Sequence, residues 1–400
     1  MKKIIYIALF AIIPALIGCN DYVTGVDKFI DKVQDDQLAD RSQLTFLQNG
    51  LLNSFAQSYD QVTYLADGLS DQLEFDSRNV DATYTSFDEV ETGTISTTNP
   101  SVLTVTLNIG EFRYFAQSFL EKVAQMQFTD NDPAEKEAYF YGNLMSGVSR
   151  YFYAAYIGLE KTNGGGPEIN KGPFIPSADM YDQAVTFIKK AIEYGTPAQN
   201  KIANTLLAKI YINQNKYTEA TQYANAGMTS GDDVFKALYT DAVTNAWASF
   251  AGSIRAQWTI PARIVNYVAV DEKEAARVKV KPYKTVSTGV IYRQDKHALE
   301  ASPLTFLSWQ ENDLMLAEIA LNGGDKATAL QKVNAVRASY GISALTDITM
   351  ATLLVEREKE LFCQGARLID QRRHTLFHLP NGWQFLPIQD RERNDNPNFN

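Results

Sequence analysis

Cysteine and histidine are scarce in this chain of 400 residues, which contains two cysteines and three histidines. Few side chains are therefore available for thiol chemistry or for a transition-metal site. The sequence also lacks the H-E-x-x-H, G-x-S-x-G and Gly-Lys phosphate-loop motifs that carry zinc, nucleophilic and phosphate chemistry. We therefore predict no catalytic residues from motifs and no cofactor.

Two short patterns come close to a metal site without completing one. His374 and His378 are four residues apart, but two histidines are an incomplete ligand set and Pro380 follows closely. The run from Asp130 to Asp132 has oxygen atoms that suit calcium, yet the start of a helix explains it more simply. We expect the histidines to pack at an interface and no metal ion to be bound.

Positive charge is also in short supply. Lysine and arginine number 37 against 47 aspartates and glutamates, which gives a net charge of −10 and a pI near 5.0. A nucleic-acid partner would require a basic face, so the sequence predicts none. After the N-terminal residues, no apolar run approaches the length needed to span a membrane.

The N-terminus has the features of a secretory signal. Lys2 and Lys3 precede an apolar run from Ile4 to Gly18, which as a helix would be about 22 Å long and too short for a bilayer core of ~30 Å. Leu16 to Cys19 resembles a bacterial lipobox, in which the signal is cut before the cysteine and the cysteine receives lipid. We predict a signal peptide over residues 1–18 and a lipid anchor on Cys19. An ordinary signal peptide with an incidental cysteine is the alternative.

If Cys19 carries lipid, only Cys363 remains and no internal disulfide is possible. Stability must then come from a hydrophobic core, for which a hydrophobic content of 45% is sufficient. We predict one body over residues 19–400, with residues 19–40 as a polar tether.

Small residues recur at fixed intervals in two parts of the chain. Ala208 is followed by Ala220 twelve residues later and by Gly227 seven residues after that, and Ala317 is followed by Ala329 at the same interval of twelve. This spacing resembles the tetratricopeptide repeat, in which paired helices cross closely through small side chains. The sequence predicts a mostly α fold, with repeat-like helices over about 133–227 and 312–341 stacked as a superhelical scaffold, long irregular loops and minor β structure.

Two segments lack a helical period. Residues 76–108 are rich in Thr, Ser and Asp and contain an alternating run over 102–107, which predicts a loop with at most a small hairpin. Residues 228–308 form a second, loop-rich segment that contains several aromatic residues. Such residues either pack the segment onto the helices or form a binding surface. As an exposed platform for a sugar we predict Trp247, Trp258 and Tyr283, with Tyr84 from the first segment.

The C-terminal quarter contains a dense pattern of opposite charges. Gly365 suits the left-handed turn between two helices of a segment over residues 349–378. The charged residues on either side can pair through planar, bidentate contacts, which favours a structural ion-pair lock over a catalytic role. The predicted lock consists of Glu356, Arg357, Glu360, Arg367 and Asp370.

This lock, the repeat-like helices and the final residues resemble the SusD/RagB family of Bacteroidetes. The run Leu386-Pro387-Ile388 followed by Asn396-Pro397-Asn398 is similar to the C-terminal sequence of that family. Residues 64–73 and 302–321 also resemble sequences of the family. Gln364 and Gln389 depart from the family pattern, where Glu and a second Pro are usual.

The resemblance implies a SusD-like, lipid-anchored protein on the outside of the outer membrane. It would capture an oligosaccharide, or a peptide as in the RagB branch, and deliver it to a SusC-like TonB-dependent transporter without catalysis. Two other interpretations stay open. One is an envelope scaffold whose repeat-like groove holds another protein, and the other is a surface-tethered hydrolase whose paired acids meet only in the fold.

Overall fold

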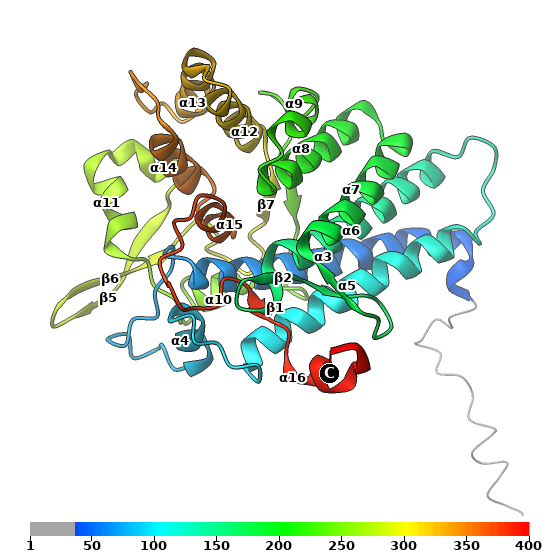
Figure 1. Ribbon diagram of the computed structural model, residues 1–400, viewed down its shortest axis with the longest axis horizontal. Helices are drawn as coiled ribbons and strands as arrows, with labels where there is room; N and C mark the ends of the chain where they lie inside the picture. Colours follow the sequence, from blue (N-terminus) through cyan, green and yellow to red (C-terminus); the bar gives the residue numbers. More distant parts are fainter. Residues whose placement is uncertain (1–36, 400) are drawn as a thin grey trace, which may run out of the picture.

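The computed structural model describes residues 37–399. The predicted signal peptide, Cys19 and nearly all of the predicted tether lie outside these residues. The described part is mostly helical with small sheets, which confirms the predicted fold class (Figure 1). Short 3-10 helices complete the inventory: η2 Gln37–Ala39, η3 Arg41–Gln43, η4 Glu272–Ala276 and η5 Pro397–Phe399.

Four long helices lie side by side and form the central layer: α3 (Leu44–Leu69), α5 (Pro100–Val123), α6 (Pro133–Tyr156) and α7 (Ser177–Tyr194) (Figure 1). In α6, the Asp132 side chain accepts a hydrogen bond from the Ala134 N–H and Pro133 occupies the first helical position, as the sequence predicts. The Asp130–Asp132 run is therefore a helix start. The buried faces of these helices supply most of the hydrophobic core.

Closely packed helix pairs follow, as the repeat-like spacing predicts. They are α8 (Pro197–Asn213) with α9 (Tyr217–Asn225) and α12 (Trp309–Asn322) with α13 (Lys326–Ser339). Ala208, Ala220, Ala317 and Ala329 are all fully buried. A Cβ atom on Gly227 would lie 2.7 Å from the Thr205 hydroxyl, so a larger residue would push the helices apart.

The prediction of a loop over residues 76–108 is wrong in part. This segment contains α4 (Thr85–Glu91) and the beginning of α5. The Asn99 side chain caps α5 by accepting from the Ser101 and Val102 N–H groups, and Pro100 occupies the first turn. The buried residues Val102, Val105 and Ile109 follow helical spacing, so the apparent alternation over 102–107 is a coincidence of a Thr-rich helix.

The segment 228–308 is more ordered than expected. It contains α10 (Ala246–Phe250), α11 (Ala262–Val270) and the antiparallel hairpin of β5 (Val280–Val286) with β6 (Gly289–Gln294). Strand β4 (Phe235–Ala237) pairs with β7 (Leu304–Leu307) and closes the segment at its base. Figure 1 shows α11 and the β5–β6 hairpin at the left edge of the molecule, away from the long helices.

The C-terminal part contains two short helices, a strand and a final helix. Helices α14 (Met350–Glu360) and α15 (Ala366–Arg373) flank Gly365, whose φ of 72° confirms the predicted left-handed turn. Strand β8 (Leu386–Pro387) pairs in parallel with β1 (Ile157–Glu160). The resulting sheet has the order β3-β2-β1-β8, with β2 at Asn163–Pro167 and β3 at Phe174–Pro176. Helix α16 (Asp390–Asp395) follows.

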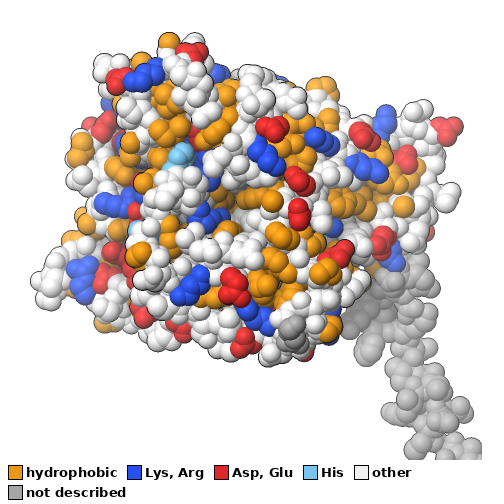
Figure 2. Space-filling model, viewed as in Figure 1, with side chains coloured by type: hydrophobic (Ala, Val, Ile, Leu, Met, Phe, Trp, Pro, Cys, Tyr) orange, Lys and Arg blue, Asp and Glu red, His pale blue; other side chains and the backbone are white. Residues whose placement is uncertain are grey.

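Two further properties concern membrane-spanning helices and surface charge. Over residues 37–399, no helix combines the length and the apolar character needed to cross a membrane. Figure 2 shows Lys and Arg side chains scattered among acidic ones on the face it presents.

Candidate functional site

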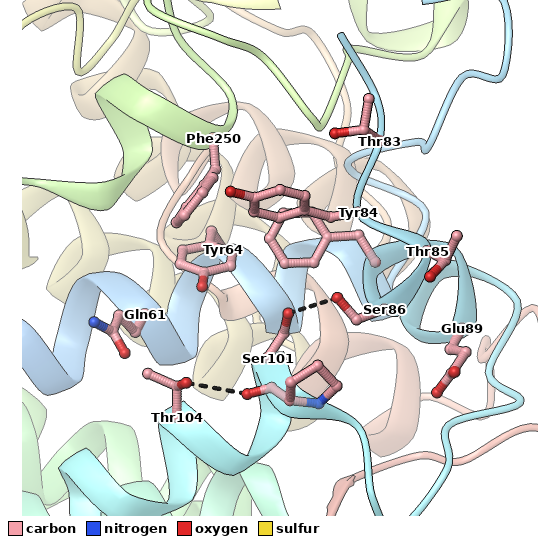
Figure 3. Close-up of a pocket in the computed structure, with 12 residues that line it drawn as sticks. Gln61, Tyr64, Thr83, Tyr84, Thr85, Ser86, Glu89, Ser101, Thr104 and Phe250 are labelled. Atoms are coloured by element: carbon pink, nitrogen blue, oxygen red, sulfur yellow. Dashed lines mark hydrogen bonds between the residues drawn. The ribbon is translucent and has the colours of Figure 1, made fainter.

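A cavity of about 520 Å³ lies where α3, α4, α5 and α10 meet. One side is aromatic, with Tyr64, Tyr84 and Phe250 shown in Figure 3, and Phe87 packs against Phe250 in the same lining. The other side is polar and includes Gln61, Ser86, Glu89, Ser101 and Thr104. We call this space the aromatic cavity. Its volume lies within the ~300–1,000 Å³ that ligand pockets usually have.

The aromatic side is a connected cluster of rings. The Phe250 ring centroid lies 5.3 Å from that of Tyr64, 5.5 Å from that of Phe87 and 5.9 Å from that of Tyr84. Phe87 and Tyr64 are buried, whereas 41% of Tyr84 is exposed. Tyr84 therefore presents a ring to solvent at the mouth, and the rings behind it fix its place.

A buried glutamine holds the loop that carries Tyr84. The side-chain oxygen of Gln257 accepts from the N–H groups of Thr83, at 2.9 Å, and Tyr84, at 3.1 Å. The Gln257 amide group donates to the Asp81 carbonyl at 2.6 Å. The Arg255 guanidinium adds a bond of 2.8 Å to the Thr83 hydroxyl and lies 5.9 Å from the Tyr84 ring centroid. The exposed ring is thus preorganised.

The polar side of the cavity carries several hydroxyl groups that can donate or accept hydrogen bonds. The Ser86 and Ser101 hydroxyls are 2.8 Å apart, and the Thr104 hydroxyl donates to the Pro100 carbonyl (Figure 3). Figure 3 shows the Tyr64 hydroxyl pointing toward this side. Burial raises the pKa of Tyr64 above its usual value, so this hydroxyl keeps its proton at neutral pH and can donate.

One carboxylate lines the cavity. The Glu89 side chain accepts hydrogen bonds from the Ser96 N–H at 3.0 Å and from the Asn99 amide at 2.9 Å. These bonds tie α4 to the start of α5 and orient the carboxylate. Glycoside hydrolysis usually requires two carboxyl groups that flank the bond, and Glu89 is alone among the described lining residues.

The prediction that Trp247 and Trp258 form an exposed platform is wrong. Both side chains are fully buried. Trp258 stacks on Phe87, with centroids 4.9 Å apart, and the Trp247 indole N–H donates to the Thr63 hydroxyl at 3.0 Å. Trp258 therefore packs behind Phe87, and Trp247 packs edge-on against Tyr64 with ring centroids 6.5 Å apart, because large apolar rings gain more from burial than from exposure.

The other two predicted platform residues have different positions. Tyr84 lines the mouth of the aromatic cavity. Tyr283 lies on β5, half-buried, and its hydroxyl donates to Asp81 and accepts from the Ala256 N–H. Burial, and then the bond to Asp81, raise the pKa of Tyr283 to about 12. Tyr283 does not line the cavity, so the structure does not bring the four predicted residues together.

Sequence reasoning missed Tyr64, Phe87 and Phe250 as cavity residues. Tyr64 and Phe87 have helical spacing that is typical of ordinary core. Phe250 stands out only as one of many aromatic residues in the segment 228–308. The sequence carries no local signal for them, because Phe250 meets Tyr64 and Phe87 only through contacts between segments far apart in the chain.

The prediction of a C-terminal lock is confirmed for the pair of Arg357 with Asp370 and is wrong for Glu360, which forms no ion pair among the described residues. Arg357 pairs with Asp370 across Gly365, with its Nε 2.9 Å from a carboxylate oxygen. Arg373 pairs with both Asp370 and Glu318 of α12. Burial opposes ionisation of Glu318, but the neighbouring His374 ring and the charges of Arg373 and Arg357 outweigh it and lower the Glu318 pKa.

The remaining lock residues face other partners. Glu356 contacts Arg277 and Arg337, each at 2.6 Å. Arg367 pairs with Asp71 at 2.7 Å. Glu360 forms no ion pair among the described residues and accepts from the Tyr340 hydroxyl at 2.9 Å. Burial raises the Glu360 pKa. These contacts join α14 and α15 to the residues that follow α3, to α13 and to the segment 228–308, so the region has a structural role.

The two C-terminal histidines show no metal arrangement. His374 lies beside Glu318, and His378 is exposed on the loop after α15. Among residues 37–399, no group of three or more His, Cys, Asp or Glu side chains is placed to hold a metal ion.

Cys363 is buried and has a positive φ of 59°.

Comparison with known proteins finds similar sequences and similar folds. Residues 314–400 match the model of the SusD family. A putative sugar binding protein from Bacteroides vulgatus superposes with a TM-score of 0.70 at 17% identity, over 89% of this chain and 97% of that chain. The chain is SusD-like in its fold and in its C-terminal sequence.

Two further solved structures also superpose on this SusD-like chain at low sequence identity. Surface glycan-binding protein A from Bacteroides thetaiotaomicron gives a TM-score of 0.71 at 14% identity, with 90% of this chain and 98% of that chain covered. A laminarin binding SusD-like protein gives 0.70 at 14% identity, with coverage of 88% and 97%. No curated protein matches the sequence.

The C-terminal motif of this SusD-like protein has a structural role. The Asn396 side chain donates to the Gly172 carbonyl at 2.9 Å, and that of Asn398 donates to the Lys171 carbonyl at 2.8 Å. These bonds attach the C-terminal residues to the loop between β2 and β3. The Asn-Pro-Asn motif therefore holds the C-terminal residues against the β2–β3 loop, and neither asparagine lines the aromatic cavity.

Proposed function

We propose that this protein captures an oligosaccharide in the aromatic cavity. The observation that carries the proposal is the exposed Tyr84 ring, held rigidly opposite a polar side. A sugar ring has an apolar C–H face that packs on an aromatic ring and hydroxyl groups that require hydrogen-bond partners. The cavity supplies both within one space of about 520 Å³.

The similar structures support a carbohydrate as the ligand. Three of them are described as a sugar binding, a glycan-binding and a laminarin binding protein. A pure protein scaffold has no need of a preorganised aromatic cavity, and hydrolysis would need a second carboxylate beside Glu89.

The proposal extends to the place and the partner of the protein. A lipid on Cys19 would hold it at the outer membrane, facing outward, and a SusC-like TonB-dependent transporter would receive the ligand. The lipobox-like sequence and the family resemblance support both steps. Membrane fractionation of a Cys19→Ala variant tests the anchor, which we expect the substitution to abolish.

Isothermal titration calorimetry tests the binding proposal directly. The purified protein, without its lipid, is titrated with a panel of neutral oligosaccharides and with peptides of similar size. We expect saturable binding of at least one oligosaccharide and none of the peptides. Binding of peptides alone would contradict the proposal.

A further inference from the structure

A second cavity, of about 340 Å³, lies on another part of the molecule. It is formed by the start of α7, the end of α8, α15 and the residues before β8. Figure 1 shows α15 next to the lower end of α8 and above β1. Its lining includes Ser177, Tyr181, Asn213, Arg372 and Phe385, and shares no residue with the aromatic cavity. We call it the Arg372 pocket.

The guanidinium group of Arg372 has no acidic partner among the described residues. It donates to two carbonyl groups, those of Gln384 at 2.6 Å and of Ala155, and lies 4.1 Å from the centroid of the Phe385 ring. Burial lowers the pKa of Arg372 to about 10, and only tyrosines act against that shift. Arg372 is half-buried, and a partly desolvated cation without a counter-charge favours an incoming anion.

The adjacent residue shows what a compensated arginine looks like here. Arg373 forms ion pairs with Glu318 at 2.6 Å and with Asp370 at 2.8 Å. Asp370 also pairs with Arg357, which lies 3.9 Å from Glu318. Two carboxylates and two guanidinium groups thus balance one another, and Arg372 stands outside this balance with one uncompensated positive charge.

The rest of the pocket suits a polyhydroxylated ring. Asn213 and Gln214, at the end of α8, line the pocket; their amide nitrogens donate to the Tyr151 hydroxyl and the Ile210 carbonyl, which leaves the carboxamide oxygens as acceptors. The Ser177 hydroxyl donates to the Ala154 carbonyl, which leaves its oxygen as an acceptor. Tyr181 and Phe385 supply ring surface. A volume near the lower end of the usual range for ligand pockets matches a single sugar unit.

We propose that the Arg372 pocket binds a sugar acid, with the ligand's carboxylate on Arg372 and its hydroxyl groups on the carboxamides. A planar carboxylate matches the fork of a guanidinium, and one negative charge equals the one positive charge that is free. The site is independent of the aromatic cavity and of the proposed function.

The test compares charged and neutral sugars of one shape. Glucuronate, glucose and acetate are each titrated into the purified full-length protein by calorimetry. We expect glucuronate to bind at least tenfold tighter than either of the others. The preference should persist in Tyr84→Ala, which alters only the aromatic cavity. Equal affinity for glucuronate and glucose would overturn the proposal, and equal affinity for acetate and glucuronate would overturn the assignment of a sugar.

Two variants and one control locate the site. Arg372→Gln should reduce the preference for glucuronate over glucose to about one. Arg150 is a matched control, since burial also lowers its pKa to about 10 and it has no acidic partner among the described residues, but it does not line this pocket. Arg150→Gln should keep the preference.

Asn213→Asp covers the case in which Arg372→Gln does not fold. It adds a carboxylate to the lining, keeps Arg372 in place and should repel glucuronate while glucose binding stays unchanged. A folded Arg372→Gln or Asn213→Asp variant that keeps the tenfold preference would overturn the proposal.

Discussion

The indole of Trp258 stacks on the ring of Phe87, with centroids 4.9 Å apart and planes inclined by 11°. Phe87 lines the aromatic cavity, whereas Trp258 lies behind it and is fully buried. The contact joins residues that are far apart in the sequence, and it makes the wall of the cavity part of the core. The pair therefore belongs both to the core and to the wall of the cavity that we propose as the binding site.

Trp258→Ala should destabilise the fold. Loss of a buried Trp or Phe side chain typically costs about 3 to 5 kcal/mol, because apolar burial is lost and a cavity remains. The backbone of Gly68 packs on the same indole, since a Cβ atom there would lie 2.4 Å from it. Urea unfolding measures the change. A variant that binds no ligand but unfolds at the wild-type urea concentration would contradict the structural role and restore Trp258 as a contact residue.

Glu356→Gln should be much more harmful than Glu360→Gln. Glu356 compensates two buried arginines, and removal of one partner of a buried ion pair typically costs about 3 to 5 kcal/mol. Glu360 accepts a hydrogen bond from Tyr340, which a glutamine oxygen can replace. Asp347→Asn, at an exposed pair with Lys326, is the control and should cost about 1 kcal/mol or less. Chemical denaturation of the three variants measures these differences, and equal losses for Glu356→Gln and Glu360→Gln would contradict the assigned partners.

The stability contributed by Glu318 should depend on pH. Its pKa is lowered in the folded protein, so its ionised form stabilises the fold above the unfolded value near 4.5. This contribution is lost as the pH falls toward the folded pKa. The difference in unfolding free energy between wild type and Glu318→Gln should therefore shrink from pH 5 to pH 3. Glu219→Gln, at an exposed position of α9, is the control, and a Glu318 difference that does not change with pH would contradict the assignment.

Local features of the fold could be predicted from the sequence. The helix start at Asp132 and Pro133 and the left-handed turn at Gly365 follow from side-chain and backbone preferences of a few neighbouring residues. The start of α5 was missed because its Thr-rich first turns alternate by chance between apolar and polar residues. Its cap at Asn99 is the stronger signal.

The site could be predicted only in part, because its contacts are long-range. Tyr84 was predicted because it lies in the Thr-rich segment without a helical period, and the structure places it in the cavity lining. The burial of Trp247 depends on Thr63, which lies 184 residues away in the sequence, and no periodicity encodes that contact. The partners in the lock could not be predicted for the same reason. The charged residues were recognised in the sequence, but Glu356 pairs with Arg277 and Arg337, which lie outside the segment 349–378.

The affinity of Tyr84→Ala for the tightest-binding neutral oligosaccharide tests the central claim most directly. Loss of a central aromatic contact typically costs about 2 kcal/mol, or roughly thirtyfold in affinity. Tyr114→Ala is the matched control, because Tyr114 is an equally simple exposed tyrosine, 64% accessible, on α5 outside the cavity lining. We predict that calorimetry shows the thirtyfold loss for Tyr84→Ala alone, with both melting temperatures close to that of the wild type. Wild-type affinity in a folded Tyr84→Ala variant would contradict the claim that the aromatic cavity holds the glycan.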